Sequence, residues 1–189
     1  IFLSALPILI IVHFALQNRS VESGNVAWYP IGRILIWLSL LGILTYLVAY
    51  AVFMQVDGGV RGSIDNYLNS ITANLAQGDR AAIDAMTATM TYIFPAIASA
   101  SWTMMNVING ALAQRLVTAS NKNIRPRPVY SEIEIPLWPA GICLLGAIFA
   151  GFGGEIGFLG FNIMLIASIP FFFIGLAVLH NISFAWPGR

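Results

Sequence analysis

Polar side chains inside otherwise apolar segments are the residues of this sequence whose chemistry could build a site. Asn106 and Asn109 are three positions apart, near one face of a helix, and Asn162 lies in a second apolar stretch. A carboxamide that faces lipid would leave its donors unpaired, so we expect each one to point toward other helices. Two uses stay open, hydrogen bonds between helices and polar positions in a ligand cavity.

Two further side chains complete this candidate ligand-binding set. Trp102 precedes Asn106 by about one helical turn and suits a cavity wall as well as ordinary packing. Glu155 follows two glycines, where a turn would spare its carboxylate the roughly 2.5 to 3.5 kcal/mol cost of the bilayer centre. A solvated turn and a contact to a substrate or cation both fit this position. The predicted ligand-binding residues are Trp102, Asn106, Asn109, Glu155 and Asn162.

The sequence lacks the patterns of an enzyme or a metal site. His13 and His180 are each solitary, with no Cys, Asp or Glu at ligand spacing. G-x-S-x-G, H-E-x-x-H and P-loop patterns are absent, and the glycines between 151 and 160 miss the dinucleotide-binding spacing because position 156 is Ile. We therefore expect no enzymatic activity, no metal and no cofactor.

The composition identifies the solvent in which these side chains must work. Of the 189 residues, 58% are hydrophobic and 9% are charged, against about 25% charged in an ordinary soluble domain. The net charge of +1 provides no extended field that would attract nucleic acid. Together with a mean hydropathy of +0.81, these values indicate a multi-pass protein of the lipid bilayer.

The apolar runs predict an all-α fold, a polytopic transmembrane helical bundle with about five spans. At about 1.5 Å per residue, the uncharged run from 34 to 54 covers the hydrocarbon thickness. Trp28, Tyr29 and Arg33 precede it as an interfacial anchor. We expect one membrane domain over residues 1–189, an interior piece of a longer chain. Its spans are predicted at about 1–16, 34–54, 90–114, 137–153 and 156–179.

A segment at about 63–77 predicts an amphipathic helix that is too polar to span the membrane. Its apolar residues recur at steps of four, three and four, which places them on one helix face. We expect it flat on the membrane surface or folded onto the other helices. Gly78 is the predicted stop and Asp79 the predicted cap of the next helix. The apolar face consists of Ile64, Leu68, Ile71 and Leu75.

Prolines fall inside several predicted spans, and two of them, Pro95 and Pro170, lie in the interior of the long third and fifth spans. Pro95 and Pro170 each remove a backbone hydrogen bond, and lipid tolerates that loss only where neighbouring groups replace it. Near Pro95, the hydroxyls of Thr91 and Ser99 are the predicted replacements. Interrupted spans of this kind are also typical of transport proteins.

Small residues four positions apart predict where helices approach closely. Packing within the chain and an oligomer contact both remain open, and the short fourth span could lie unusually close to the fifth. The predicted packing residues are Ala96, Ala100, Gly146, Ala150, Gly151, Gly153 and Gly157.

Loop arginines and lysines predict the orientation. Placing the first residues outside puts seven of the nine basic residues inside, and the opposite choice puts two there. The basic loop at 118–136 is then cytoplasmic, and segment 55–88 lies on the other side. The expected location is a bacterial inner membrane.

Several local patterns resemble the YybS-like family of predicted bacterial inner-membrane proteins. They are the sequence from Trp28 to Arg33 before a span, the loop from Arg125 to Pro128, the run from Ile135 to Trp138, and the end of a span from Gly175 to His180. The resemblance implies a bundle similar to the substrate-capturing components of energy-coupling-factor transporters, with an outward-facing pocket. We expect the first and last helices of such a fold to lie outside this sequence.

Two functions follow as expectations. The first is a non-enzymatic component for solute binding or transport, with a small-molecule solute held by the amides. The alternative is a structural or assembly subunit that binds other membrane proteins through its small-residue faces and its basic loop.

Overall fold

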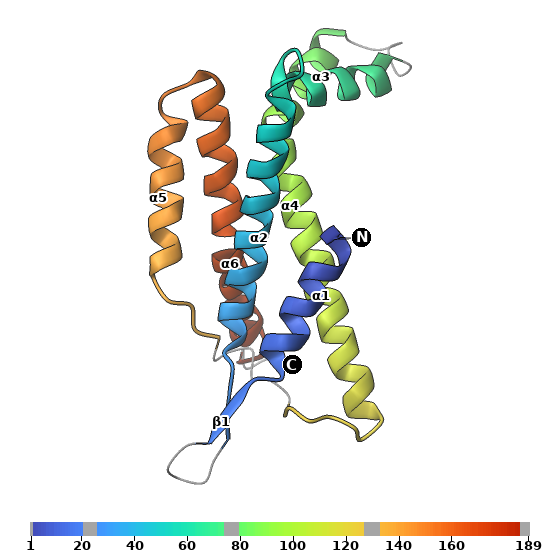
Figure 1. Ribbon diagram of the computed structural model, residues 1–189, viewed down its shortest axis with the longest axis vertical. Coiled ribbons are helices and arrows are strands. Elements are labelled where there is room, and N and C mark those ends of the chain that lie inside the picture. Colours follow the sequence, from blue (N-terminus) through green and yellow to red (C-terminus); the bar gives the residue numbers. More distant parts are fainter. Residues whose placement is uncertain (1, 21–25, 74–79, 127–132, 186–189) are drawn as a thin grey trace.

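The computed structural model describes residues 2–20, 26–73, 80–126 and 133–185. Within them the chain is all-α apart from one short hairpin, which confirms the all-α part of the predicted fold (Figure 1). The elements are α1 (Phe2–Ala15), β1 (Asn18–Ser20), β2 (Val26–Trp28), α2 (Ile31–Phe53), α3 (Gly59–Thr72), α4 (Arg80–Ala119), α5 (Trp138–Ala150) and α6 (Gly154–Ala185).

Three of the five predicted spans are confirmed as helices long and apolar enough to cross a membrane, namely α2, α4 and α6. The other two are shorter apolar helices. With 14 and 13 residues, α1 and α5 reach only about 20 Å, against about 30 Å of hydrocarbon. The fourth span was predicted to continue to Gly153, but the backbone leaves the helix after Ala150. Gly153 and Gly154 then adopt positive φ values of 71° and 57° and turn the chain into α6.

The amphipathic helix starts earlier than predicted. Gly58 takes a left-handed conformation with φ 77° and forms the N-cap of α3, so Gly62 lies inside the helix and does not end it. In Figure 1, α3 crosses the end of the bundle. It is held on α4 by the Thr91 hydroxyl, which donates to Asp65 Oδ1 at 3.2 Å. Leu75 and the predicted boundary at Gly78 and Asp79 lie outside the described residues.

The β1–β2 hairpin was not predicted. Asn18 pairs with Trp28 and Ser20 with Val26 in an antiparallel register. Strands of three residues are too short for an alternating pattern to stand out in the sequence. The hairpin joins the C-terminus of α1 to the N-terminus of α2.

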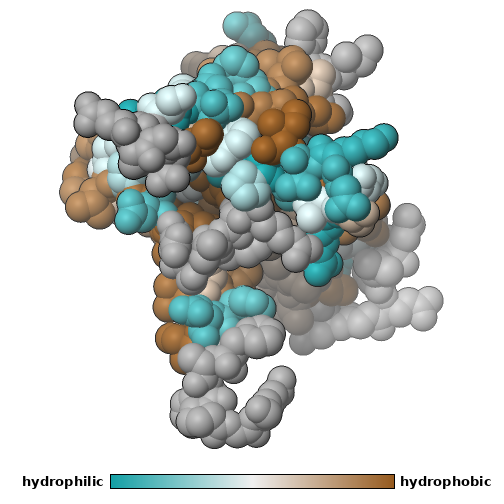
Figure 2. Space-filling model, turned by 90° about the horizontal axis from the view of Figure 1, so that it is seen from below, coloured by the Kyte–Doolittle hydropathy of each residue, from teal (hydrophilic) through white to brown (hydrophobic). Residues whose placement is uncertain are grey.

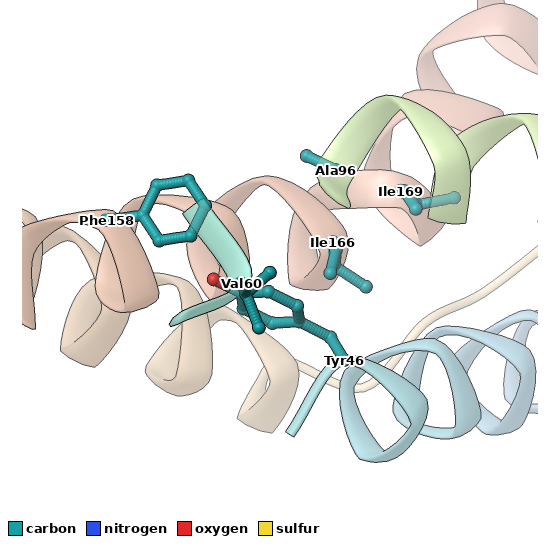
Figure 3. Close-up of a cluster of buried hydrophobic side chains, with 6 residues drawn as sticks. All are labelled: Tyr46, Val60, Ala96, Phe158, Ile166 and Ile169. Carbon is teal, nitrogen blue, oxygen red and sulfur yellow. The ribbon is translucent and has the colours of Figure 1, made fainter. Parts of the chain in front are cut away.

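The core lies where α2, α3, α4 and α6 meet. Tyr46, Val60, Ala96, Phe158, Ile166 and Ile169 are buried together there (Figure 3). The helices α1 and α5 lie outside this cluster, with α5 packed on α6 and α1 on α2 and α4. The bundle therefore has one closed centre and a looser corner where the short α1 joins it.

The break at Pro170 in α6 is compensated from another helix. Proline lacks an N–H, so the carbonyl of Ile166, four residues earlier, loses its usual donor. The Ser39 hydroxyl of α2 donates to this carbonyl at 2.7 Å in a buried position. A side chain 127 positions away thus supplies the hydrogen bond that the proline removes.

This pairing predicts that Ser39→Ala lowers the free energy of unfolding by about 1 kcal/mol, because it leaves a buried carbonyl without a donor. In Pro170→Ala, the backbone N–H of residue 170 is restored and can donate to the Ile166 carbonyl. Ser39→Ala should therefore lower the free energy of unfolding clearly less in that protein. Unfolding in mixed detergent micelles measures both. Ser168→Ala is the control, since that hydroxyl donates within α6 to Leu165. Equal losses on the two backgrounds would contradict the pairing.

Basic residues collect at the end of the bundle where α1 and α4 end and α2 begins. Seen end-on, hydrophilic side chains gather at this end between apolar ones (Figure 2). Among the described residues, Arg19, Arg33, Arg115, Lys122 and Arg125 belong to these segments, whereas Arg61 and Arg80 belong to the α3 end. We refer to the first as the basic end.

Candidate binding cavity

A cavity of about 130 Å³ lies in the looser corner between α1, α2 and α4. Its walls are mainly aliphatic, and it extends along α4 from Asn106 to Gln114, about 12 Å at 1.5 Å per residue. At the basic end, Arg125 closes its lining. Aliphatic walls are contributed by Ile11, Ile34, Leu35, Leu38 and Val107, with Gly110 between them.

Asn106 is the polar group deepest in this cavity. Its side chain is only 8% exposed, and its Nδ2 donates to the Trp102 carbonyl oxygen at 2.8 Å. Among the described residues the amide makes no other hydrogen bond, so one N–H and the Oδ1 acceptor stay unengaged. An amide whose oxygen and second N–H are unused, next to an apolar cavity, can bind a polar group of a ligand.

Arg125 lies at the other end of the cavity. Its guanidinium donates to the Ala15 carbonyl oxygen at 3.2 Å and to the Tyr29 carbonyl oxygen at 3.0 Å. The Ala15 bond satisfies an orphan carbonyl at the C-terminus of α1, where a cation is also favoured by the helix dipole. The guanidinium also lies 6.0 Å from the Trp28 ring centroid. The end of α1 and the end of β2 with the residue after it therefore fix its position.

The electrostatics of Arg125 are those of a half-buried cation without an acid. No carboxylate pairs with it within the described part of the chain, where one ion pair, Arg80 with Asp84, is found. Burial lowers the pKa of the Arg125 guanidinium from its ordinary value, but an arginine remains charged at neutral pH. Its two hydrogen bonds use two of five N–H donors, which leaves donors for an anion.

A second, polar concavity of about 420 Å³ adjoins the hairpin at the basic end. It contains two exposed arginines, Arg19 and Arg33, beside Trp28 and Tyr29. Tyr29 accepts a hydrogen bond from Trp37 Nε1 at 3.1 Å, and its ring packs 4.8 Å from that of Phe14. Aromatic and basic side chains gathered at one level are typical of the membrane interface, as predicted for Trp28, Tyr29 and Arg33.

Asn162 is fully buried and acts inside the protein. Its Oδ1 accepts from the Ala96 N–H at 3.0 Å, and its Nδ2 donates to the carbonyls of Tyr92 at 3.0 Å and Phe158 at 2.9 Å. A regular helix would pair the Ala96 N–H with the Tyr92 carbonyl. Asn162 of α6 thus bonds both groups of the helical pair next to Pro95, one residue after the Thr91 carbonyl that loses the proline's donor.

This arrangement corrects the prediction that a hydroxyl compensates the Pro95 break. Thr91 donates to Asp65 on α3, and Ser99 makes no hydrogen bond among the described residues. The carboxamide bonds an N–H and a carbonyl at the same time because its oxygen and its nitrogen are two separate atoms, whereas a hydroxyl has a single oxygen for both roles.

The other predicted ligand residues do not meet at one point. Trp102 is half-buried and contributes its carbonyl to Asn106, whereas Asn109 is exposed. Glu155 is exposed in the first turn of α6, where it accepts from the Tyr50 hydroxyl at 3.4 Å. Asn162 binds at Ala96, about 15 Å along α4 from Asn106. Of the five, Asn106 alone lines the cavity.

The small residues define a close contact between α5 and α6. A methyl group added at Gly146 would lie 2.7 Å from the Met164 nitrogen, and one at Gly157 would lie 3.2 Å from the Ala150 oxygen. The predicted set omitted Gly160. A methyl group added there would lie 2.8 Å from the Gly146 oxygen. Ala96 belongs to the central core, while Ala100, Gly151 and Gly153 are exposed.

Comparison with known proteins gives a family and no function. A family model described as "Predicted membrane protein (DUF2232)" matches residues 4–186. No curated protein and no solved structure matches the chain. The similarity to energy-coupling-factor components therefore stays a prediction. Metal ligands do not cluster in the described ranges, where no three His, Cys, Asp or Glu side chains come together.

Proposed function

The chain belongs to the DUF2232 family of predicted membrane proteins, and from this premise we propose that it is a non-enzymatic component for solute binding or transport whose ligand occupies the cavity between α1, α2 and α4. The single observation that carries this proposal is the amide of Asn106. The residue is 8% exposed beside the cavity, and its Oδ1 and one N–H have no partner among the described residues, so a polar group of a ligand can bind them.

The construction of the bundle supports a ligand that enters and leaves. The cavity belongs to the corner formed by α1, which is too short to cover the full length of α4 (Figure 1). The two proline breaks lie in α4 and α6, the longest helices of the described chain, and broken helices are a recurrent part of transport proteins. The basic end, where Arg125 closes the cavity, is the cytoplasmic end in this proposal.

Photoaffinity labelling tests the proposal. The probe is a neutral medium-chain alcohol that carries a diazirine, applied to the purified protein in detergent. Labels should fall on the cavity walls of α1, α2 and α4. Ala111→Phe fills the cavity from α4 and should reduce this labelling about tenfold, equivalent to about 1.4 kcal/mol of binding.

Ala113→Phe is the matched control, because this alanine lies on the same helix, is exposed and does not line the cavity. It should leave the labelling of the cavity walls unchanged. Labels scattered over the outer faces of the helices, or equal labelling of the two variants, would overturn the proposal.

A second function, a subunit that joins other membrane proteins, is favoured by the length of α4. Its 40 residues extend about 60 Å, twice the hydrocarbon thickness. Beyond the predicted span, Leu116 and Ile124 are 70% and 73% exposed at the basic end. Stoichiometric co-purification with one membrane complex in mild detergent would support this function.

A further inference from the structure

The cavity has the dimensions of a hydrocarbon segment. Its volume of about 130 Å³ is comparable to the roughly 150 Å³ of engineered apolar cavities that hold one benzene molecule. Nine of its twelve lining residues are apolar, and the exceptions are Asn106, Gln114 and Arg125. A strongly hydrated solute would lose its water against these walls without gaining equivalent hydrogen bonds. An alkyl or isoprenoid chain forms no hydrogen bonds to water, so it would lose none on entering the cavity.

The charge is confined to one end of the cavity. Arg125 has unused donors and no acid partner among the described residues, and the Ala15 and Tyr29 carbonyls hold it in place. Gln114 supports the same loop, because its Nε2 donates to the Arg125 carbonyl oxygen at 3.2 Å. A guanidinium fixed in this way binds phosphate or carboxylate oxygens, often with two hydrogen bonds.

The depth of Arg125 matches that of lipid headgroups. Trp28, Tyr29 and Trp37 lie at the same end of the bundle and mark the membrane interface. Arg19 and Arg33, in the adjoining concavity, add two further cations at this level. An anion bound here would therefore have its attached chain pointing along α4 into the apolar cavity.

We propose that the ligand of this site is an anionic amphiphile of the bilayer, with its phosphate or carboxylate on Arg125 and its hydrocarbon chain between α1, α2 and α4. This inference rests on the proposed function and adds the chemical class of the ligand to it. The Asn106 amide then contacts the buried part of the ligand's hydrocarbon chain. Its free N–H and oxygen would favour a ligand whose hydrocarbon chain carries a hydroxyl or carbonyl group.

Three diazirine probes with the same chain and different headgroups test this inference on the unmodified protein. The headgroups are a carboxylate, a neutral alcohol and a primary amine. Each probe is titrated in detergent, and the labelling of the Ala111→Phe protein is subtracted as nonspecific labelling. The carboxylate should half-saturate the cavity label at about one tenth of the alcohol concentration, and the amine should be weakest. Equal concentrations for carboxylate and amine would overturn the inference.

Variants of the arginine assign the preference to its guanidinium. Arg125→Gln should remove the advantage of the carboxylate and leave labelling by the alcohol in place, whereas Arg125→Lys should keep part of it. Arg115→Gln is the control, because it removes the same charge from an exposed position of α4 that does not line the cavity. A carboxylate preference that survives in Arg125→Gln would refute the role of Arg125.

Inorganic phosphate separates a free anion from a lipid headgroup. At millimolar concentration it should fail to protect the cavity from the carboxylate probe, because it has no chain to bury. Full protection by phosphate alone would show a site for a free anion and overturn the amphiphile. Failure of the proposed function looks different, since then even the neutral alcohol would not label the cavity walls selectively.

Discussion

Replacing Asn162 with leucine is expected to lower the free energy of unfolding by about 2 to 3 kcal/mol. Leucine has the same branched arrangement of side-chain heavy atoms as asparagine, so the change creates no cavity and removes the hydrogen bonds. It leaves the Ala96 N–H and the Tyr92 carbonyl without partners in a fully buried position. Interhelical bonds in membranes average about 0.6 kcal/mol each, and orphaned groups add about 1 to 3 kcal/mol. Unfolding in mixed detergent micelles, followed by tryptophan fluorescence, measures the loss.

The same substitution at Asn109 is the control, because this residue is exposed on α4 and should tolerate leucine in lipid or detergent. A second background separates the Pro95 break from simple packing. In Pro95→Ala, the helix can close its own Ala96–Tyr92 bond, so Asn162→Leu should cost less there. Identical losses with and without Pro95 would show that Asn162 does not compensate the break.

The long helices could be predicted from the composition and from the lengths of the apolar runs, because a protein that lies in lipid needs long apolar helices. The segments at α2, α4 and α6 contain long uncharged apolar runs, and each forms a helix at or near the expected residues. Failures occurred where a few residues decide the outcome. Gly58 begins α3 four residues early through a left-handed φ, and Gly153 and Gly154 shorten the fourth apolar segment.

The partners of the polar residues could not be predicted, although their burial could. Asn162 was expected to point toward other helices, and it is fully buried. Its targets are backbone groups of Tyr92 and Ala96, 70 and 66 positions away, which no sequence spacing connects to it. The same holds for Ser39, whose target is a carbonyl freed by Pro170. A proline inside a span signals that a donor is needed, not where it comes from.

For Arg125, the burial itself could not be predicted. From the sequence, Arg125 is one charge of the basic loop and part of a loop pattern shared with a family, and neither places it at a cavity, because loop arginines normally face water. Its side chain instead returns to α1 and bonds Ala15, 110 positions away. No local pattern distinguishes Arg125 from Lys122, which is exposed. The cavity therefore depends on tertiary packing of the short α1, and its charged end depends on one loop conformation.

The contact between α5 and α6 predicts a second large effect on stability. Alanine should destabilise the protein at one glycine of α5 and stabilise it at another. At Gly146, an added methyl group would meet the Met164 nitrogen at 2.7 Å, the Gly160 oxygen at 2.9 Å and the Met164 Cα at 2.9 Å. These are backbone atoms of α6, so no side-chain rotation relieves the overlap and the two helices must separate. Gly146→Ala should therefore lower the free energy of unfolding by about 3 kcal/mol.

Gly141 provides the matched control five residues earlier in α5, where an added methyl group meets nothing within 4 Å. Alanine restricts the unfolded chain and favours a helix, so Gly141→Ala should raise the free energy of unfolding by about 0.5 to 1 kcal/mol. The two proteins differ only in the position of one methyl group, and denaturation of both in the same micelles gives the comparison. Stabilisation by both substitutions would mean that α5 does not lie against α6 at Gly146, since only an open helix face gains from alanine at every glycine.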